Sequence, residues 1–68
     1  MDCILIKRLR QNKGMSQRDF AKLLGISRSA LAQIESGYKQ VTSDITAKIN
    51  HSLPQDYIEK VRDLYCAH

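Results

Sequence analysis

The stretch that most constrains the fold is a pair of short helical segments joined at a glycine, residues 16–38. Ser16 is a residue type that caps helix N-termini, and apolar side chains follow it at helical spacing. Gly25 comes next, where a helix that ends needs a left-handed residue. Ser27 is the next cap, and Gly37 ends the second segment. Because two helices of about two turns bury little surface alone, the flanking residues must complete the core.

The flanking residues predict three further helices and no strand, so the expected fold class is all-α, a compact domain of five helices. The first spans residues 3–13, with Gly14 after it. The fourth begins after Thr42 or Ser43. The last spans residues 54–66, with Pro54 in its first turn, where a missing N–H is tolerated. At 68 residues without repeat or linker, we expect one domain over residues 1–68.

The net charge of +4 is unevenly distributed along the chain. Residues 1–39 hold eight Lys or Arg against three acids, whereas residues 40–68 hold three against four. The basic excess therefore belongs to the part with the helical pair and favours a polyanion as partner. The alternative is an ordinary solvated basic surface. Neither a membrane span nor a signal peptide is present in the pattern, so we expect a cytoplasmic protein.

Catalytic and metal-binding patterns are absent from the sequence. No Ser/His/Asp or Cys/His set suggests a shared pocket, and His51 and His68 lack partners at metal-ligand spacing. Cys3 and Cys66 lie near opposite ends and form no Cys-x-x-Cys pair, so two free thiols are favoured over a disulfide. We expect no enzyme activity, no metal and no cofactor.

The second helix of the pair has an outer face nearly free of bulky apolar groups. At about 100° per residue its short or hydrogen-bonding side chains lie together. These residues are Arg28, Ser29, Ala32, Gln33 and Ser36.

Residues 6–53 resemble the helix-turn-helix family of phage repressors, Cro proteins and their bacterial relatives, the XRE family. The positions that carry the resemblance are Leu9-Arg10, Ser16-Gln17, Phe20-Ala21, Leu24-Gly25-Ile26-Ser27, Leu31, Ile34-Glu35 and Gly37. The resemblance implies a lambda-repressor-like domain whose second and third helices form the helix-turn-helix. It also implies an ion pair between Arg10 and Glu35, although both could instead be solvated.

The resemblance further implies that the third helix enters the major groove of double-stranded DNA. The expected base-reading residues are Arg28, Ser29, Ala32 and Gln33. Arg28 matches guanine O6 and N7, and Gln33 suits adenine N6 and N7. Alternatively, Arg28 contacts phosphate only, and Ser29 and Ala32 are exposed helix residues that read no base. The expected phosphate ligands are Gln17, Ser27, Tyr38, Lys39, Thr42 and Ser43.

The last helix carries a wide apolar band. Part of the band must cover the core, and the remainder is expected to form a dimer seam. Its residues are Tyr57, Ile58, Val61, Leu64 and Tyr65. A homodimer places two recognition helices in successive major grooves about 34 Å apart, on a pseudo-palindromic site. Leu53-Pro54-Gln55 departs from the family's usual step after the fourth helix, which leaves the dimer geometry open.

The expected function is a sequence-specific transcription regulator, a dimeric repressor or autoregulator of a phage or mobile-element operon. It would block RNA polymerase or, if its DNA site were placed differently, contact the polymerase. The alternative is a protein-interaction module, antitoxin-like or inhibitory, that uses the last helix and binds DNA secondarily.

Overall fold

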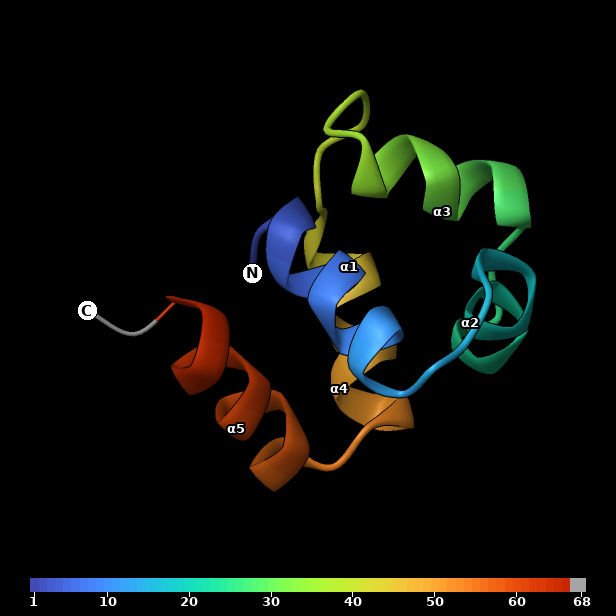
Figure 1. Cartoon of the computed structure of the whole chain (residues 1–68). Coiled ribbons are helices and arrows are strands. Elements are labelled where there is room, and N and C mark those ends of the chain that lie inside the picture. The colour runs from blue at the N-terminus through green and yellow to red at the C-terminus, as the bar shows by residue number, and fades with distance from the viewer. Residues whose placement is uncertain (67–68) are drawn as a thin grey trace.

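The computed structural model describes residues 1–66, which form five α-helices and no strand (Figure 1). The helices are α1 (Cys3–Asn12), α2 (Gln17–Leu24), α3 (Arg28–Glu35), α4 (Ser43–Ser52) and α5 (Gln55–Cys66). The predicted all-α fold, with α2 and α3 as the helix-turn-helix pair, is confirmed. His68, which the sequence predicts to lack metal-ligand partners, lies outside the described residues.

Each of the first four helices begins at a side chain that caps it. Asp2, Ser16, Ser27 and Thr42 each accept the backbone N–H three residues later, at 2.8, 3.1, 3.0 and 3.3 Å. Of the two candidate caps before α4, Thr42 is therefore the one used. These bonds satisfy amide groups that have no partner within the helix, and each cap typically stabilises its helix by about 1 kcal/mol.

The turn between α2 and α3 depends on Gly25. Its φ of +77° lies in the left-handed region, and its N–H donates to the Ala21 and Lys22 carbonyls at the end of α2.

Two predicted helix boundaries, the end of α1 and the start of α5, were wrong by one residue. α1 ends at Asn12, with Lys13 as its C-cap, and α5 begins at Gln55, because the Pro54 carbonyl accepts the first helical N–H bond, from Ile58.

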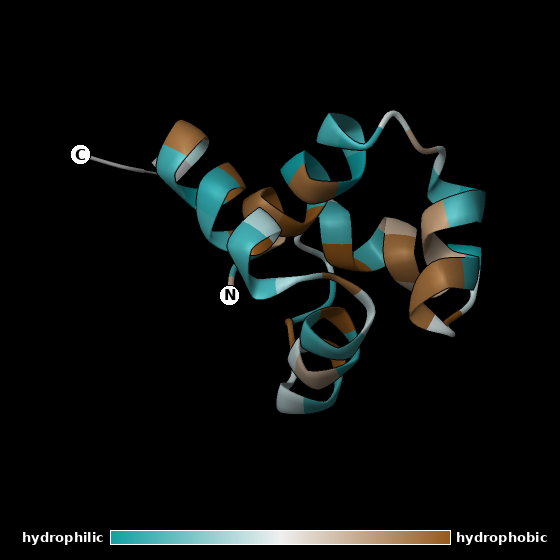
Figure 2. Ribbon diagram, turned by 90° about the horizontal axis from the view of Figure 1, so that it is seen from below, coloured by the Kyte–Doolittle hydropathy of each residue, from teal (hydrophilic) through white to brown (hydrophobic). Residues whose placement is uncertain are grey.

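The core is formed by apolar side chains from all five helices and from the residue that follows α4. α1 packs on α3 and α5, and α2 packs on α3 and α4, so α1 lies between α3 and the C-terminal helix α5. Figure 2 shows polar and apolar residues alternating around the helices, as amphipathic helices require. The core residues are Leu5, Ile6, Leu9, Phe20, Ala21, Leu24, Leu31, Ile34, Ile49, Leu53, Ile58 and Val61.

The apolar band of α5 is divided between the core and the surface. Ile58 and Val61 are 1% and 0% exposed, so assigning them to a dimer seam was wrong: α1 of the same chain covers this face of α5. Tyr57 is half-buried, and its hydroxyl donates to the Leu9 carbonyl at 2.8 Å. Leu64 and Tyr65 alone among the five remain exposed, at 63% and 44%.

Two further predictions concern thiols and membranes. Cys3 carries a free thiol, and the side chain of Cys66 lies outside the described part of the chain. The longest helix has 12 residues, and none of those described has the length and apolarity that crossing a bilayer demands.

Candidate nucleic-acid interface

The outer face of α3 is held in place by its inner face. Leu31 and Ile34 are 0% and 2% exposed, and together they fix the rotation of the helix about its axis. Arg28 and Ser29 are consequently exposed at its N-terminal end. The remaining predicted base readers, Ala32 and Gln33, are half-buried on the next turn.

The far end of α3 is tied to α1 by an ion pair. Arg10 Nε donates to Glu35 Oε2 at 2.8 Å, and Arg10 Nη2 donates to Glu35 Oε1 at 3.1 Å. The Glu35 side chain is 3% exposed and that of Arg10 15%, so the alternative of two solvated side chains is excluded. The third guanidinium nitrogen, Nη1, donates to the Met15 carbonyl at 3.0 Å. Such a fork restricts orientation more than a single charge contact does.

Gln17 extends this network to α2. Its Nε2 donates to Glu35 Oε1 at 3.2 Å, so Glu35 receives bonds from both α1 and α2. The resemblance indicated a phosphate role for Gln17, and nothing in its sequence position pointed to this bond. One N–H of the amide is engaged by Glu35, which leaves the second available.

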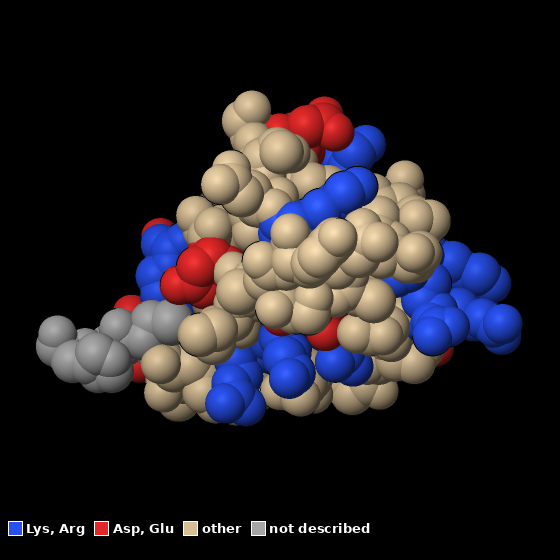
Figure 3. All heavy atoms as spheres, turned by 90° about the horizontal axis from the view of Figure 1, so that it is seen from above, with Lys and Arg blue, Asp and Glu red and all other residues tan. Residues whose placement is uncertain are grey.

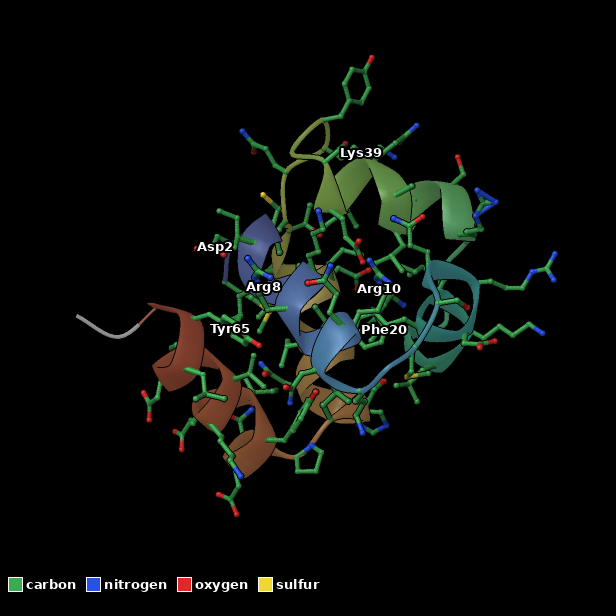
Figure 4. All side chains as sticks on the ribbon, viewed as in Figure 1. Asp2, Arg8, Arg10, Phe20, Lys39 and Tyr65 are labelled. Carbon is green, nitrogen blue, oxygen red and sulfur yellow. The ribbon has the colours of Figure 1, made fainter. Side chains whose placement is uncertain are left out.

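An open hollow of about 590 Å³ lies where the N-terminal ends of α2 and α3 approach the end of α1. Figure 4 shows Arg10 reaching from α1 toward α3 on this side. Three arginines, one serine and one glutamine therefore border a single open space. Its lining residues are Arg10, Ser16, Gln17, Arg18 and Arg28.

Arg18 is a residue that the sequence predictions missed. It follows the first residue of α2, beside the Ser16 cap, where an anion is favoured by free amide groups and by the helix dipole. The place of Arg18 in the first turn of α2 was the sequence feature that could have indicated a phosphate contact. The hollow lies between Arg18 on α2 and Arg28 on α3, so side chains that carry positive charge border it from two different helices.

The other predicted phosphate ligands flank α3. Ser27 precedes it, and its oxygen accepts the capping bond, which leaves the hydroxyl hydrogen free to donate. Beyond the C-terminal end of α3, Tyr38 is 83% exposed, and Lys39, Thr42 and Ser43 are also exposed. Figure 3, which views the molecule from the α3 side, shows Lys and Arg groups spaced around a mostly uncharged area, with Asp and Glu groups between them at several points.

Within residues 1–66, no group of three or more His, Cys, Asp or Glu side chains is arranged to hold a metal ion. All buried side-chain nitrogen and oxygen atoms among residues 1–66 have hydrogen-bond partners.

Comparison with protein families identifies the arrangement. A family model described as helix-turn-helix matches residues 6–54, well over half of the chain. Comparisons with curated proteins and with solved structures gave no significant match. The matched family consists of DNA-binding regulators and is not a family of enzymes. The chain belongs to the XRE-type helix-turn-helix family of DNA-binding transcription regulators, with the fold of lambda repressor and Cro.

Proposed function

We propose that the chain is a sequence-specific repressor that inserts α3 into the major groove of its operator. The observation that carries this proposal is the Arg10–Glu35–Gln17 network, which ties α3 to α1 and α2. Readout of base edges requires donors and acceptors held within a few tenths of an ångström, and a rigidly anchored α3 meets that need.

Base reading is divided along the outer face of α3. Arg28, exposed at the N-terminal end, presents its guanidinium fork to guanine O6 and N7. Gln33, more than one turn later, pairs with adenine N6 and N7. Ser29 donates or accepts at a neighbouring base, and Ala32 contacts a thymine methyl group.

Phosphate contacts position the helix from both of its ends. The hollow beside α2 receives one phosphate through Gln17 and Arg18, and Ser27, the N-cap of α3, adds a contact from outside the hollow. The loop after α3 and the start of α4 hold a second through four exposed residues. These are Tyr38, Lys39, Thr42 and Ser43.

A homodimer supplies the second recognition helix. One such helix has a small footprint, and two-fold symmetry doubles it on a pseudo-palindromic operator with half-sites about 34 Å apart. Bound in the cytoplasm across a phage or mobile-element promoter, the dimer excludes RNA polymerase; a displaced site would let it contact the polymerase instead.

Selection from a random pool of DNA duplexes tests this function. We expect enrichment of an inverted repeat, followed in gel shifts by specific binding with a steep dependence on salt. Equal binding to selected and random duplexes at moderate salt would contradict it. That outcome would favour the alternative of a protein-interaction module, which the exposed Leu64 and Tyr65 side chains would serve.

A further inference from the structure

The chain turns differently after α3 than it does after α1 and α2. Each of the three helices is followed within two residues by a glycine of positive φ. After α1 and α2, the residue next to that glycine donates its N–H directly to the carbonyl five residues back. These bonds join Met15 to Arg10 at 3.2 Å and Ile26 to Ala21 at 3.0 Å. A bond of this kind is a common way for a helix that ends at glycine to satisfy one of its last carbonyls.

After α3, the hydroxyl group of Ser36 takes the place of that direct bond. The residue next to the glycine is Tyr38, and its N–H donates to Ser36 Oγ at 3.4 Å. Ser36 Oγ in turn donates to the Gln33 carbonyl, five residues before Tyr38, at 3.0 Å. A hydroxyl group can donate and accept at the same time. It therefore stands between an amide and a carbonyl that would otherwise correspond to the directly bonded pairs after α1 and α2.

The inserted hydroxyl moves the direct backbone bond one residue along the chain. Lys39 donates its N–H to the Gln33 carbonyl at 3.1 Å. Since a carbonyl oxygen has two lone pairs, it can accept both the Ser36 hydroxyl and the Lys39 amide. The turn after α3 is thus one residue longer than the other two, and Figure 1 shows the chain folding back in this small loop. Lys39 is thereby fastened to the last turn of α3.

The longer turn carries exposed side chains that are proposed to hold a phosphate. Tyr38 is 83% exposed, and Figure 4 shows Lys39 beside the C-terminal end of α3. The loop is fastened to the backbone of Gln33, the residue whose side chain is proposed to pair with adenine. The spacing between the base contact and the phosphate contact is therefore set by hydrogen bonds that meet at one residue.

We propose that Ser36 is a positioning residue, which sets the length of this turn and so brings Tyr38 and Lys39 to a DNA phosphate. The inference rests on the proposed function, in which these two side chains contact phosphate. Because phosphate oxygens only accept hydrogen bonds, a hydroxyl whose hydrogen is engaged by the Gln33 carbonyl has none to offer them. Without the hydroxyl, the Tyr38 N–H would bond that carbonyl directly, and the shortened turn would displace Lys39.

Hydrogen exchange of the backbone amides, followed by NMR on the free chain, tests the turn itself. In Ser36→Ala, the Tyr38 N–H should stay protected because it takes over the Gln33 carbonyl, whereas the Lys39 N–H should lose its protection. Equal loss of protection at both amides would mean that the hydroxyl only stabilises the loop. That result, or an unchanged Lys39 amide, would overturn the proposal.

Gel shifts at four salt concentrations test the consequence for DNA binding. Ser36→Ala should bind selected and random duplexes about three- to tenfold more weakly, and its salt slope should approach that of Lys39→Ala. The same substitution should cost the Lys39→Ala chain much less than it costs wild type. Ser36→Thr keeps a hydroxyl and should bind better than Ser36→Ala. Ser52→Ala is the matched control, since it removes a hydroxyl that donates to the Leu23 carbonyl at 3.2 Å, and it should leave binding unchanged.

The outcomes separate this role from a direct contact and from the proposed function. If Ser36→Ala keeps the full salt slope and its loss adds fully to that of Lys39→Ala, the hydroxyl contacts DNA itself and the positioning role is wrong. Unchanged affinity, or a loss confined to the base that Gln33 reads, would overturn it too. A wild-type chain without preference for selected duplexes would instead refute sequence-specific regulation, while the coupling of Ser36 to Lys39 is still measured on random duplexes.

Discussion

Arg10 and Glu35 form a two-point ion pair across 25 positions of sequence, with N···O distances of 2.8 and 3.1 Å. The carboxylate is the more deeply buried partner, with 3% of the side chain exposed against 15% for the guanidinium. Because Gln17 and Arg10 both donate to this carboxylate, one acid connects three helices. Glu35 therefore acts as the anchor that sets the position of α3.

Arg10→Met should destabilise the fold by about 3 kcal/mol, because it leaves the Glu35 carboxylate buried with only the Gln17 amide as partner. Urea unfolding followed by circular dichroism measures the change. The substitution should also weaken DNA binding, since Arg10 lines the basic hollow beside α2.

The double variant Arg10→Met with Glu35→Leu serves as control. Removing both charges eliminates the uncompensated carboxylate, so stability should return most of the way to wild type, while DNA binding stays reduced. A single variant that loses less than about 1 kcal/mol would show that Glu35 is better solvated than its burial implies.

Local features of the fold were predictable from sequence because they depend on a few adjacent residues. A cap needs one side-chain oxygen three residues before a backbone amide, as at Ser16 and Ser27. Gly25 supplies the left-handed backbone conformation that its own turn requires. Such features need no knowledge of distant contacts. The pairing of Arg10 with Glu35 is long-range, and it was expected only through the family resemblance.

Features that arise where separate helices pack together were not predicted from the sequence. Helical periodicity indicates how wide the apolar band of α5 is, but it does not reveal that α1 covers Ile58 and Val61 and leaves Leu64 exposed. Likewise, Arg18 and Arg28 are ten positions apart in the chain and share a hollow only after α2 and α3 have packed.

Arg18→Ala should weaken binding to every DNA sequence by a similar factor. A side chain that neutralises one phosphate contributes about one unit to the slope of log affinity against log salt concentration, and the variant should lose that unit. Gel shifts at four salt concentrations, on selected and random duplexes, measure both effects. Lys60→Ala removes one positive charge from α5, away from α3, and should leave the slope nearly unchanged.

Arg28→Lys separates base reading from phosphate contact. Lysine keeps the positive charge but loses the planar fork, so discrimination at one base pair of each half-site should fall by about 1–3 kcal/mol while the salt slope stays constant. Binding of the variant to operators substituted at each position identifies that base pair. If discrimination is retained and only the salt slope changes, Arg28 contacts phosphate alone.

Gly25→Ala should cost about 1–2 kcal/mol from backbone strain alone. The residue has a φ of +77°, and an added Cβ would meet no atom within 4 Å, so no steric clash adds to the strain. Gly25→Asn should cost less, because asparagine tolerates the left-handed region better. Thermal unfolding of both variants measures the difference. Equal losses would indicate that the turn relaxes away from positive φ.

Val61 and Leu64 lie one turn apart on α5 but are expected to respond oppositely to alanine substitution. Val61→Ala removes two methyl groups from a fully buried site, so it should destabilise the fold by about 2 kcal/mol and leave self-association of the folded chain unchanged. Leu64→Ala trims a side chain that is 63% exposed, so stability should change by no more than about 0.5 kcal/mol while self-association weakens. Urea unfolding and sedimentation equilibrium on both variants compare the two responses. Weaker association in folded Val61→Ala would mean that the inner face of α5 takes part in the dimer after all, which would require α5 to move away from α1.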